Sequence, residues 1–246
     1  MALPLAGRRA LVTGASGGIG GAVAAGLAQA GADVALTYSG HREDAETVSQ
    51  TITDLGRRAV VVKSDLGAAG AGRDVVEQVS GTFGPLDVLV ANAGAGVQRP
   101  WDDVDDGLWD QTFAVNVTAT WQMTRAALPG MIERGFGRIL YVSSVAAFTG
   151  GIVGPHYAAS KAALHGLMHH LAARAAGSGV TINTIAPALI AGTRMLPGGP
   201  DGPDPARVPV GHLGQPADIA GMALAMLTNP YLTSKVITVD GGIYPA

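Results

Sequence analysis

The sequence predicts an α/β fold in which a doubly wound parallel sheet of seven strands is covered by helices on both faces. Three observations predict it. Short apolar runs rich in β-branched residues alternate with segments whose apolar residues recur every three or four positions. The runs are apolar at nearly every position, as expected of parallel strands that are buried on both faces. No change of composition interrupts the alternation, so we expect one domain over residues 1–246.

The apolar runs give the expected strands in chain order. They are Ala10–Thr13, Asp33–Tyr38, Ala59–Ser64, Asp87–Asn92, Arg138–Ser143, Val180–Ala186 and Lys235–Val239. The segments between them carry one apolar stripe each, which is typical of helices packed on a sheet. Examples of these stripes are Ile19/Val23/Leu27, Val48/Ile52/Leu55, Leu164/Leu167/Met168/Leu171 and Ile219/Met222/Met226.

Residues Pro197 to Pro205 consist only of Pro, Gly and Asp. Proline lacks the amide donor that a helix interior or a central strand needs, and glycine loses the most backbone entropy on ordering. We therefore expect an irregular loop there that holds no helix and is either a lid or disordered.

Composition excludes several classes of protein. The chain has 246 residues, no cysteine and a formal net charge of −3. It therefore has no disulfide scaffold, thiolate nucleophile or cysteine-ligated metal, and its slightly acidic balance argues against a nucleic-acid partner. The uncharged stretch 10–32 contains too many glycines for a secretory or membrane-spanning segment. We expect a cytoplasmic protein that binds neither membrane nor nucleic acid.

A glycine-rich segment follows the first strand and opens directly into a helix. It reads Thr13-Gly14-Ala15-Ser16-Gly17-Gly18-Ile19-Gly20. Glycine permits positive φ and close approach of the backbone to a ligand, while the amides at a helix amino terminus attract a pyrophosphate. A tight turn without a ligand is the alternative. The strand–turn–helix context favours a dinucleotide site and hence a Rossmann-type fold.

Tyr157 and Lys161 lie four residues apart where a helical pattern begins. A helix places both side chains on one face, with Cβ atoms roughly 5–6 Å apart. A nearby ammonium stabilises a phenolate and lowers its pKa from the ordinary value of ~10. The pair is therefore a candidate acid catalyst, and the alternative is an ordinary amphipathic helix that happens to contain one Tyr and one Lys.

These motifs resemble, in order and spacing, those of the short-chain dehydrogenases/reductases over essentially the whole chain. The matching positions are Gly14-xxx-Gly18-x-Gly20, Asp65-Leu66, Asn92-Ala93-Gly94, Asn116, Ser144, Tyr157-xxx-Lys161 and Val239-Asp240-Gly241-Gly242. Within that superfamily the chain is most similar to the 3-oxoacyl-acyl-carrier-protein reductases. Two segments carry the nearer resemblance: Tyr38-Ser39-Gly40, and His212-Leu213-Gly214-Gln215-Pro216-Ala217-Asp218-Ile219-Ala220.

The resemblance implies a catalytic role for four residues. Tyr157 is the general acid in reduction, Lys161 tunes its pKa and binds the nicotinamide ribose, and Ser144 hydrogen-bonds the substrate oxygen. Asn116 kinks its helix and holds a water that relays protons to Lys161. Ser143, one residue before Ser144, is expected to point to the other face of its strand.

The resemblance also implies the cofactor-binding residues. The residues around the pyrophosphate are Thr13, Gly14, Ser16, Gly17, Gly18, Ile19 and Gly20. Tyr38, Ser39 and Arg42 lie at the adenosine ribose, and Asp65 and Leu66 contact the adenine. Asn92, Ala93 and Gly94 stabilise the central strand beside the cofactor. Tyr157, Lys161, Pro187 and Ile190 lie on the nicotinamide side, next to a substrate loop at about residues 188–214.

The sequence departs from the family pattern at several places. Gly17 stands where many NADP-dependent members carry Arg, Ala188 replaces a usual glycine, and Thr193 comes one residue late. Ser234-Lys235 replaces a glycine-led turn before the last strand. His165 and His169 have the spacing of a zinc-binding helix, but lack a catalytic Glu and a third ligand, so we expect no metal.

We therefore expect an NADPH-dependent reductase of ketones such as 3-oxoacyl compounds, with a role in fatty acid biosynthesis implied by the nearer resemblance. NADP(H) is favoured over NAD(H) because Tyr38 stands where NAD-binding members carry a carboxylate. Ser39 can donate a hydroxyl to the 2′-phosphate, and Arg42 can offer it a planar fork of donors. The alternatives are an NAD-dependent alcohol, sugar or steroid dehydrogenase and a non-catalytic nucleotide sensor.

Two expectations concern partners. The stripe Trp109, Phe113, Val117 and Trp121 suits either the core or an interface, and the family implies a homotetramer. Arg134 and Arg138 are expected beside the mouth of the site, where reductases dock acyl carrier protein. A serine replaces the second docking arginine after Arg174, so we expect weak docking of a carrier-bound thioester.

Overall fold

The computed structural model describes residues 3–196 and 203–244. Within them, seven parallel strands form one sheet in the order β3-β2-β1-β4-β5-β6-β7. The chain runs outward from β1 to β3, crosses back to β4 beside β1, and then runs outward to β7. This is the doubly wound order, which places a ligand site where the direction of winding reverses. The strands are β1 (Arg9–Val12), β2 (Asp33–Tyr38), β3 (Ala59–Lys63), β4 (Val88–Ala91), β5 (Gly137–Val142), β6 (Val180–Pro187) and β7 (Val236–Val239).

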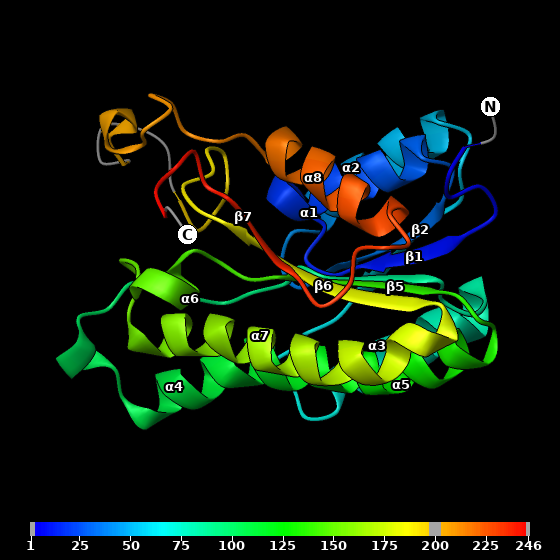
Figure 1. Cartoon of the computed structure of the whole chain (residues 1–246), viewed down its shortest axis with the longest axis horizontal. Helices are drawn as coiled ribbons and strands as arrows, with labels where there is room; N and C mark the ends of the chain where they lie inside the picture. Colours follow the sequence, from blue (N-terminus) through cyan, green and yellow to red (C-terminus); the bar gives the residue numbers. More distant parts are fainter. Residues whose placement is uncertain (1–2, 197–202, 245–246) are drawn as a thin grey trace.

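Helices cover both faces of the sheet (Figure 1), with α1, α2 and α8 on one face and α3, α4, α5 and α7 on the other. The α-helices are α1 (Gly18–Gln29), α2 (Arg42–Asp54), α3 (Ala71–Phe83), α4 (Asp106–Phe113), α5 (Ala119–Glu133), α6 (Ala146–Thr149), α7 (Pro155–Ala175) and α8 (Pro216–Thr228). Short 3₁₀ helices span Trp101–Asp103, Ala176–Ser178 and Pro205–Arg207, and a π-helical turn spans Ala114–Thr118. No helix in the described ranges is long and apolar enough to cross a membrane.

The predicted fold class is confirmed, and each predicted strand is found with its ends within one residue. Alternate residues of a strand face opposite sides of the sheet, so a strand covered on both sides needs apolar residues throughout. Leu11, Leu89, Ile139 and Ile182 stand in register across four strands and face the layer of α3, α5 and α7. Each is almost completely buried, which contributes about 1.5–3 kcal/mol per side chain.

The predicted helix stripes are correct except at two positions. Leu55 lies just past the end of α2 and is 40% exposed, because the helix has already ended there. Met222 of α8 is 38% exposed, since Ile219, Ala223 and Met226 cover the sheet instead.

Most of the predicted loop Pro197–Pro205 lies outside the described residues. Its last residue, Pro205, begins a 3₁₀ helix, so the expectation of a loop without helices is wrong there. Proline is favoured in the first turn of a helix because its missing N–H would have no partner at that position.

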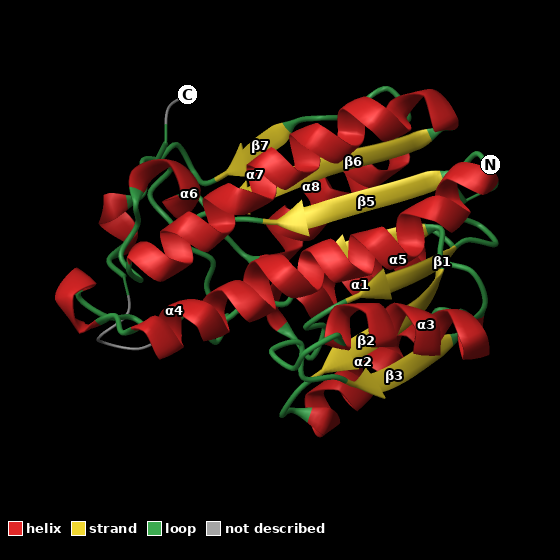
Figure 2. Cartoon of the chain, turned by 90° about the horizontal axis from the view of Figure 1, so that it is seen from below, coloured by secondary structure: helices red, strands yellow, loops and turns green. Residues whose placement is uncertain are grey.

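The strands all point toward the end of the molecule that carries α4 and α6 (Figure 2). The carboxyl ends of parallel strands meet at one edge of a sheet, so the segments that follow them lie close together. The glycine-rich segment, Asn92 and Ser144 each follow a different strand at this edge, and Tyr38 is the last residue of a fourth strand, β2.

Candidate active site

The glycine-rich loop between β1 and α1 packs tightly against the end of β4. A Cβ at Gly14, whose φ is 62°, would lie 2.9 Å from the Cα of Ala93. Asn92 Nδ2 donates to the carbonyl oxygens of Thr13 and Gly14, at 2.9 and 3.1 Å. Thr13 Oγ1 in turn accepts from the backbone amides of Asn92 and Ala93. A Cβ at Gly20 would clash with the Asn92 amide. The structure therefore brings Thr13, Gly14, Gly20, Asn92 and Ala93 together.

The opposite side of this loop is open. No described atom lies within 4 Å of the place where a Cβ of Gly17 would be, and its φ is 108°. The first turn of α1, which starts at Gly18 and includes Ile19, lacks acidic residues, so its free amides attract an anion. Thr37 Oγ1 accepts from the Gly14 amide and fixes the loop to the end of β2. The loop therefore fits the pyrophosphate of a dinucleotide.

The adenosine side of the candidate site is formed after β2 and β3. Tyr38 is half-buried at the end of β2, and Ser39 is exposed beside it. Arg42 opens α2, where its Nε forms an exposed 2.6 Å ion pair with Glu46. Asp65 is exposed and caps the turn after β3 by accepting from the Gly67 amide, while Leu66 is buried.

Tyr157 and Lys161 lie in the first two turns of α7, which begins at Pro155. Both side chains are buried, at 6% and 3% exposed, and Lys161 Nζ lies 5.6 Å from the centre of the Tyr157 ring. Lys161 Nζ also donates to the carbonyl oxygen of Val142, at 2.8 Å. Ser144 follows β5, its Oγ accepts from the Ala146 amide at 3.1 Å, and it lies close enough to Tyr157 to lower the pKa of that phenol. The predicted tyrosine, lysine and serine therefore meet at the end of β5.

Burial dominates the acid–base behaviour of this pair. It raises the pKa of Tyr157 to about 12, and the hydrogen bond with Ser144 offsets part of that rise. It lowers the pKa of Lys161 to about 8. The sequence predicts that the ammonium of Lys161, together with the positive charge of the nicotinamide, lowers the tyrosine pKa. The net shift runs the other way because desolvation disfavours the charged form of each group.

Asn116 lies in the π-helical turn between α4 and α5, which is the predicted kink. Its Oδ1 accepts from the Ala95 amide at 2.7 Å, and its Nδ2 donates to the Ala95 carbonyl and to Ser160 Oγ. A Cβ at Gly94 would lie 3.1 Å from Lys161 Nζ and 3.5 Å from Asn116 Oδ1, so both polar groups face this glycine. The predicted role of Asn116 in holding a water stays a prediction.

The segment after β6 carries the residues predicted for the nicotinamide side. The carbonyl oxygen of Pro187 accepts from the Val145 amide, which ties β6 to the residue after Ser144. Ile190 is buried and pairs with Gly214 through a short β-bridge. Ile190 is therefore held by these contacts, although Ala188 replaces the usual glycine and Thr193 comes one residue later than in the family pattern.

The model of the short chain dehydrogenase family matches residues 8–200 of this chain. The chain belongs to the short-chain dehydrogenase family. Over 247 residues it is 36% identical to L-rhamnose 1-dehydrogenase (NAD(P)(+)) of Sphingomonas sp. (strain SKA58), with 98% of this chain and 97% of that protein covered.

Two solved structures of the family are closely similar. A blue fluorescent protein from a metagenomic library, in complex with NADPH, is 36% identical with a TM-score of 0.92, covering 98% of this chain and 100% of that one. A 3-oxoacyl-(acyl-carrier-protein) reductase of Agrobacterium tumefaciens C58, with NADP bound, is 35% identical with a TM-score of 0.90, covering 98% and 96%. This dehydrogenase is thus an NAD(P)-dependent oxidoreductase acting on a CH–OH group.

Several residues near the site were missed by sequence reasoning. Gly96 passes directly over Tyr157, since a Cβ there would lie 2.7 Å from the ring atom Cδ2. Ser160 stands inside the Tyr157-xxx-Lys161 motif, and its bond to Asn116 depends on tertiary contact. Arg194 reaches back to the glycine-rich loop and bonds Ser16. Only Ser160 had a signal in the sequence, its place within a known motif.

The two histidines with zinc spacing bond to serines. His165 Nε2 lies 2.9 Å from Ser143 Oγ, which also donates to the carbonyl oxygen of Lys161. His169 Nδ1 lies 2.9 Å from Ser234 Oγ. Ser234 itself has a φ of 58°, which glycine adopts more readily, as expected where it replaces a glycine-led turn. In the part of the chain that the structure describes, no cluster of three or more metal-ligating side chains occurs.

The expected docking arginines lie at the wrong end of the sheet within one chain. Arg134 ends α5 and Arg138 lies near the start of β5, whereas Ser144 follows the end of that strand. Six residues of strand separate the two edges by roughly 20 Å. Arg138 is also 93% buried, because its Nη1 donates to the carbonyls of Gly137 and Gly179 and its guanidinium lies over the Phe136 ring.

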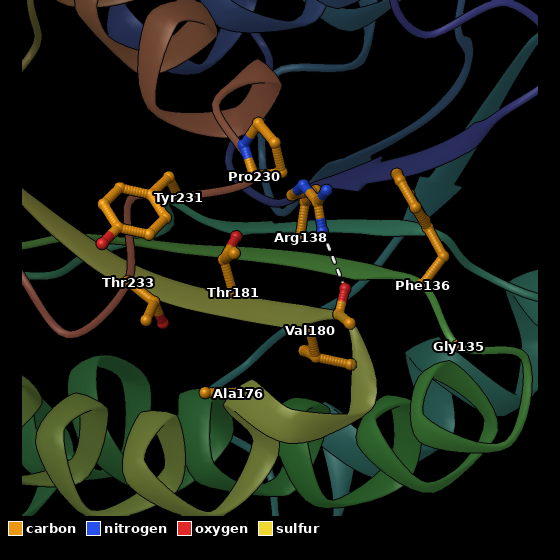
Figure 3. A pocket seen from close by; sticks show the side chains of 10 residues that line it. Gly135, Phe136, Arg138, Ala176, Val180, Thr181, Pro230, Tyr231 and Thr233 are labelled. Atoms are coloured by element: carbon orange, nitrogen blue, oxygen red, sulfur yellow. Dashed lines mark hydrogen bonds between the residues drawn. The ribbon is translucent and has the colours of Figure 1, made fainter.

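A cavity of about 400 Å³ lies beside Arg138 at this amino-terminal edge (Figure 3). Thr181, near the start of β6, and Tyr231 and Thr233, in the segment before β7, also line it, at the edge of the sheet opposite Tyr157. Burial, and to a smaller degree the nearby Arg8, lower the pKa of Arg138. The cavity is therefore separate from the candidate active site.

Proposed function

We propose that this protein reduces a ketone to a secondary alcohol, with Tyr157 as proton donor and NADPH as the preferred cofactor. The observation that carries the proposal is the meeting of Tyr157, Ser144 and Lys161 at the end of β5, beside the open face of the glycine-rich loop. We further propose a single cytoplasmic domain over residues 1–246, with its substrate loop at about residues 188–214.

A nicotinamide bound in this site would supply the hydride. Tyr157 donates its hydroxyl proton to the carbonyl oxygen as charge develops there, and Ser144 donates a hydrogen bond that orients the same oxygen. An ammonium has three donors, so Lys161 can bind a ribose hydroxyl while it keeps its bond to Val142. Burial keeps the Tyr157 phenol protonated at neutral pH, so the proton that reduction requires is present.

The rim of the candidate site supports a substrate with apolar substituents. Val97, Phe148 and Ile152, which follow β4 and β5, are 47%, 39% and 60% exposed. Gly96, beside Val97, packs on Tyr157, and a Cβ there would also lie 3.1 Å from Val153. Large apolar side chains gathered around a polar centre are typical of small-molecule sites.

The relationship to L-rhamnose 1-dehydrogenase favours a second candidate, an NAD(P)-dependent oxidation of a sugar or another polyol. A panel of ketones at fixed NADPH, set against a panel of sugars and alcohols at fixed NAD and NADP, separates the two. Steady NADPH consumption with an apolar ketone is expected. Turnover of sugars alone would overturn the proposal.

The preference for NADPH is supported by Tyr38, which puts no carboxylate beside the adenosine ribose. One charge-assisted hydrogen bond to the 2′-phosphate is worth ~1.5–3 kcal/mol, or roughly ten- to a hundredfold in kcat/KM. We expect Tyr38→Asp to reverse the preference. Equal kcat/KM for NADPH and NADH in the unaltered enzyme would contradict it.

We propose that acyl carrier protein docks weakly, because buried Arg138 offers no surface charge and steering by charge acts mainly on association rates. Free ketones or thioesters are then reduced about as well as carrier-bound substrate. A thousandfold advantage of the carrier-bound form in kcat/KM would contradict this.

We propose a homotetramer. Trp109 and Trp121 are 38% and 40% exposed in the single chain, and Trp109 stacks on Phe113 with ring centres 5.0 Å apart. Aromatic residues on an exposed helix face are enriched in interfaces. A mass near that of one chain by light scattering at micromolar concentration would contradict this proposal.

A further inference from the structure

Arg194, in the segment that follows β6, bridges the glycine-rich loop and α2. Its Nη1 donates to Ser16 Oγ at 3.2 Å, and its Nη2 donates to the Ser16 carbonyl oxygen at 2.9 Å. The same Nη2 lies 2.6 Å from the carboxylate of Asp44, in the first turn of α2. Thr193 supports this position, because its methyl group lies 3.6 Å from the place of a Cβ at Gly18.

These contacts put a guanidinium beside the open face of the loop. The neighbouring Gly17 has no side chain, and no described atom lies within 4 Å of where one would begin. The other nearby arginine, Arg42, is turned to Glu46 on its own helix. Of these two arginines, Arg194 is the one whose side chain bonds the glycine-rich loop.

We propose that Arg194 binds the 2′-phosphate of NADP(H) and supplies the positive charge that Gly17 lacks. This inference rests on the proposed function, since the 2′-phosphate distinguishes NADP(H) from NAD(H). The position between Ser16 and the first turn of α2 is on the adenosine side, because α2 follows Tyr38 at the end of β2. A planar guanidinium donates two parallel hydrogen bonds to a phosphate, which a lysine cannot do.

Asp44 holds Arg194 in place in the absence of an anion. Both side chains of this ion pair are more than half exposed, at 53% and 57%, and pairs of this kind contribute little to stability. A phosphate dianion therefore displaces the carboxylate from the guanidinium at small cost. Asp44 therefore competes with the 2′-phosphate for the Arg194 guanidinium, and replacing Asp44 by a neutral residue should strengthen NADPH binding.

Calorimetric titration with NADPH, NADH, 2′,5′-ADP and 5′-ADP tests the proposal without turnover. Arg194→Gln is expected to raise the Kd of NADPH and of 2′,5′-ADP by roughly tenfold or more, because one charge-assisted hydrogen bond is lost. The Kd of NADH and of 5′-ADP should stay within about twofold of the unaltered protein. The matched control is Arg207→Gln, an exposed arginine in the same connection between β6 and α8, which should change none of the four.

The outcomes separate this inference from the proposed function. If NADPH and NADH binding were weakened equally, Arg194 would bind the pyrophosphate that both cofactors share, and the proposal would be wrong. Unchanged binding of both cofactors would also overturn it. If the unaltered enzyme bound NADPH no better than NADH, the proposed preference would fail, yet a selective loss of 2′,5′-ADP in Arg194→Gln would still support the role of Arg194.

A second variant tests the competition with Asp44. Asp44→Asn is expected to tighten NADPH binding by a larger factor when Arg194 is present than in the Arg194→Gln background. An equal gain in both backgrounds would mean that Asp44 acts on the phosphate without Arg194, and would contradict the exchange of partners.

Discussion

Asn116 Nδ2 donates a hydrogen bond of 2.9 Å to Ser160 Oγ, and both residues are buried. The bond joins the π-helical turn Ala114–Thr118 to α7, the helix that carries Tyr157 and Lys161. Ser160 Oγ also donates to the Tyr157 carbonyl oxygen at 2.8 Å. A single hydroxyl therefore connects the kinked helix with the backbone of the proposed proton donor.

Replacing Ser160 by alanine removes this connection. Asn116 Nδ2 keeps its bond to Ala95 but loses a buried acceptor, which costs about 1–3 kcal/mol in the free energy of unfolding. Urea unfolding measures the loss. Thr47→Ala is the control, because Thr47 also donates to a carbonyl one turn earlier but is exposed on α2. Equal effects of the two substitutions would show that the Asn116–Ser160 bond contributes nothing.

Tyr157→Phe keeps the ring but deletes the proton donor. We expect kcat to fall by at least ~10²-fold with little change in cofactor affinity, since acid catalysis is worth about 10²–10⁴-fold. Tyr141→Phe is the matched control, because Tyr141 is a fully buried tyrosine of β5 whose hydroxyl bonds Thr124 at 2.8 Å. It should lose stability while its turnover stays near normal. If Tyr157→Phe kept half of the normal turnover, Tyr157 would not be the proton donor.

The strands were predictable because each has to be apolar on both faces to lie in this sheet. The rule determines residues such as Leu89 and Val90, which face opposite helical layers. Helix ends were less predictable. Leu55 continues the apolar stripe of α2, but the helix ends at Asp54 and leaves Leu55 exposed.

The site was predictable as a set of motifs, but its contacts were not. Arg194 is 178 residues from Ser16 and 150 from Asp44, and no local pattern encodes bonds over such separations. Arg138 was expected at the surface, yet it is buried because the carbonyls of Gly137 and Gly179 accept its hydrogen bonds. Sequence spacing predicts which face of an element a residue shares, and tertiary packing decides which partner it meets.

Gly96→Ala is expected to disturb catalysis through the position of Tyr157. The new Cβ would lie 2.7 Å from Tyr157 Cδ2, closer than real Cβ atoms come, and the buried ring has to move. Displacement of a catalytic group by about 1 Å costs up to ~10²-fold in rate, so we expect kcat to fall at least tenfold while the Kd of NADPH changes little.

The control for this substitution is Gly81→Ala in α3. No described atom lies within 4 Å of a Cβ at that position, and alanine in a helix is favoured over glycine. It should leave kcat unchanged and raise stability slightly. Unchanged kcat in Gly96→Ala would show that the loop after β4 does not fix the Tyr157 ring.

Lys161 is expected to make stability depend on pH in a defined window. Burial lowers its pKa to about 8 in the folded protein, whereas an unfolded lysine has a pKa near ~10.4. Between these values the unfolded chain binds more protons than the folded one, so the free energy of unfolding rises with pH. Below pH 8 both states are protonated, and the folded protein bears the full cost of burying the charge.

Comparison with Lys161→Met isolates this contribution, because the other titrating groups are shared by the two proteins. The stability of the unaltered protein relative to Lys161→Met should increase as pH rises from about 8 to about 10, and level off at either end. Urea unfolding of both proteins at several pH values measures this difference. A relative stability that stays constant across this window would mean that Lys161 keeps an ordinary pKa despite its burial. A relative stability that falls would mean that the pKa of Lys161 is raised in the folded protein.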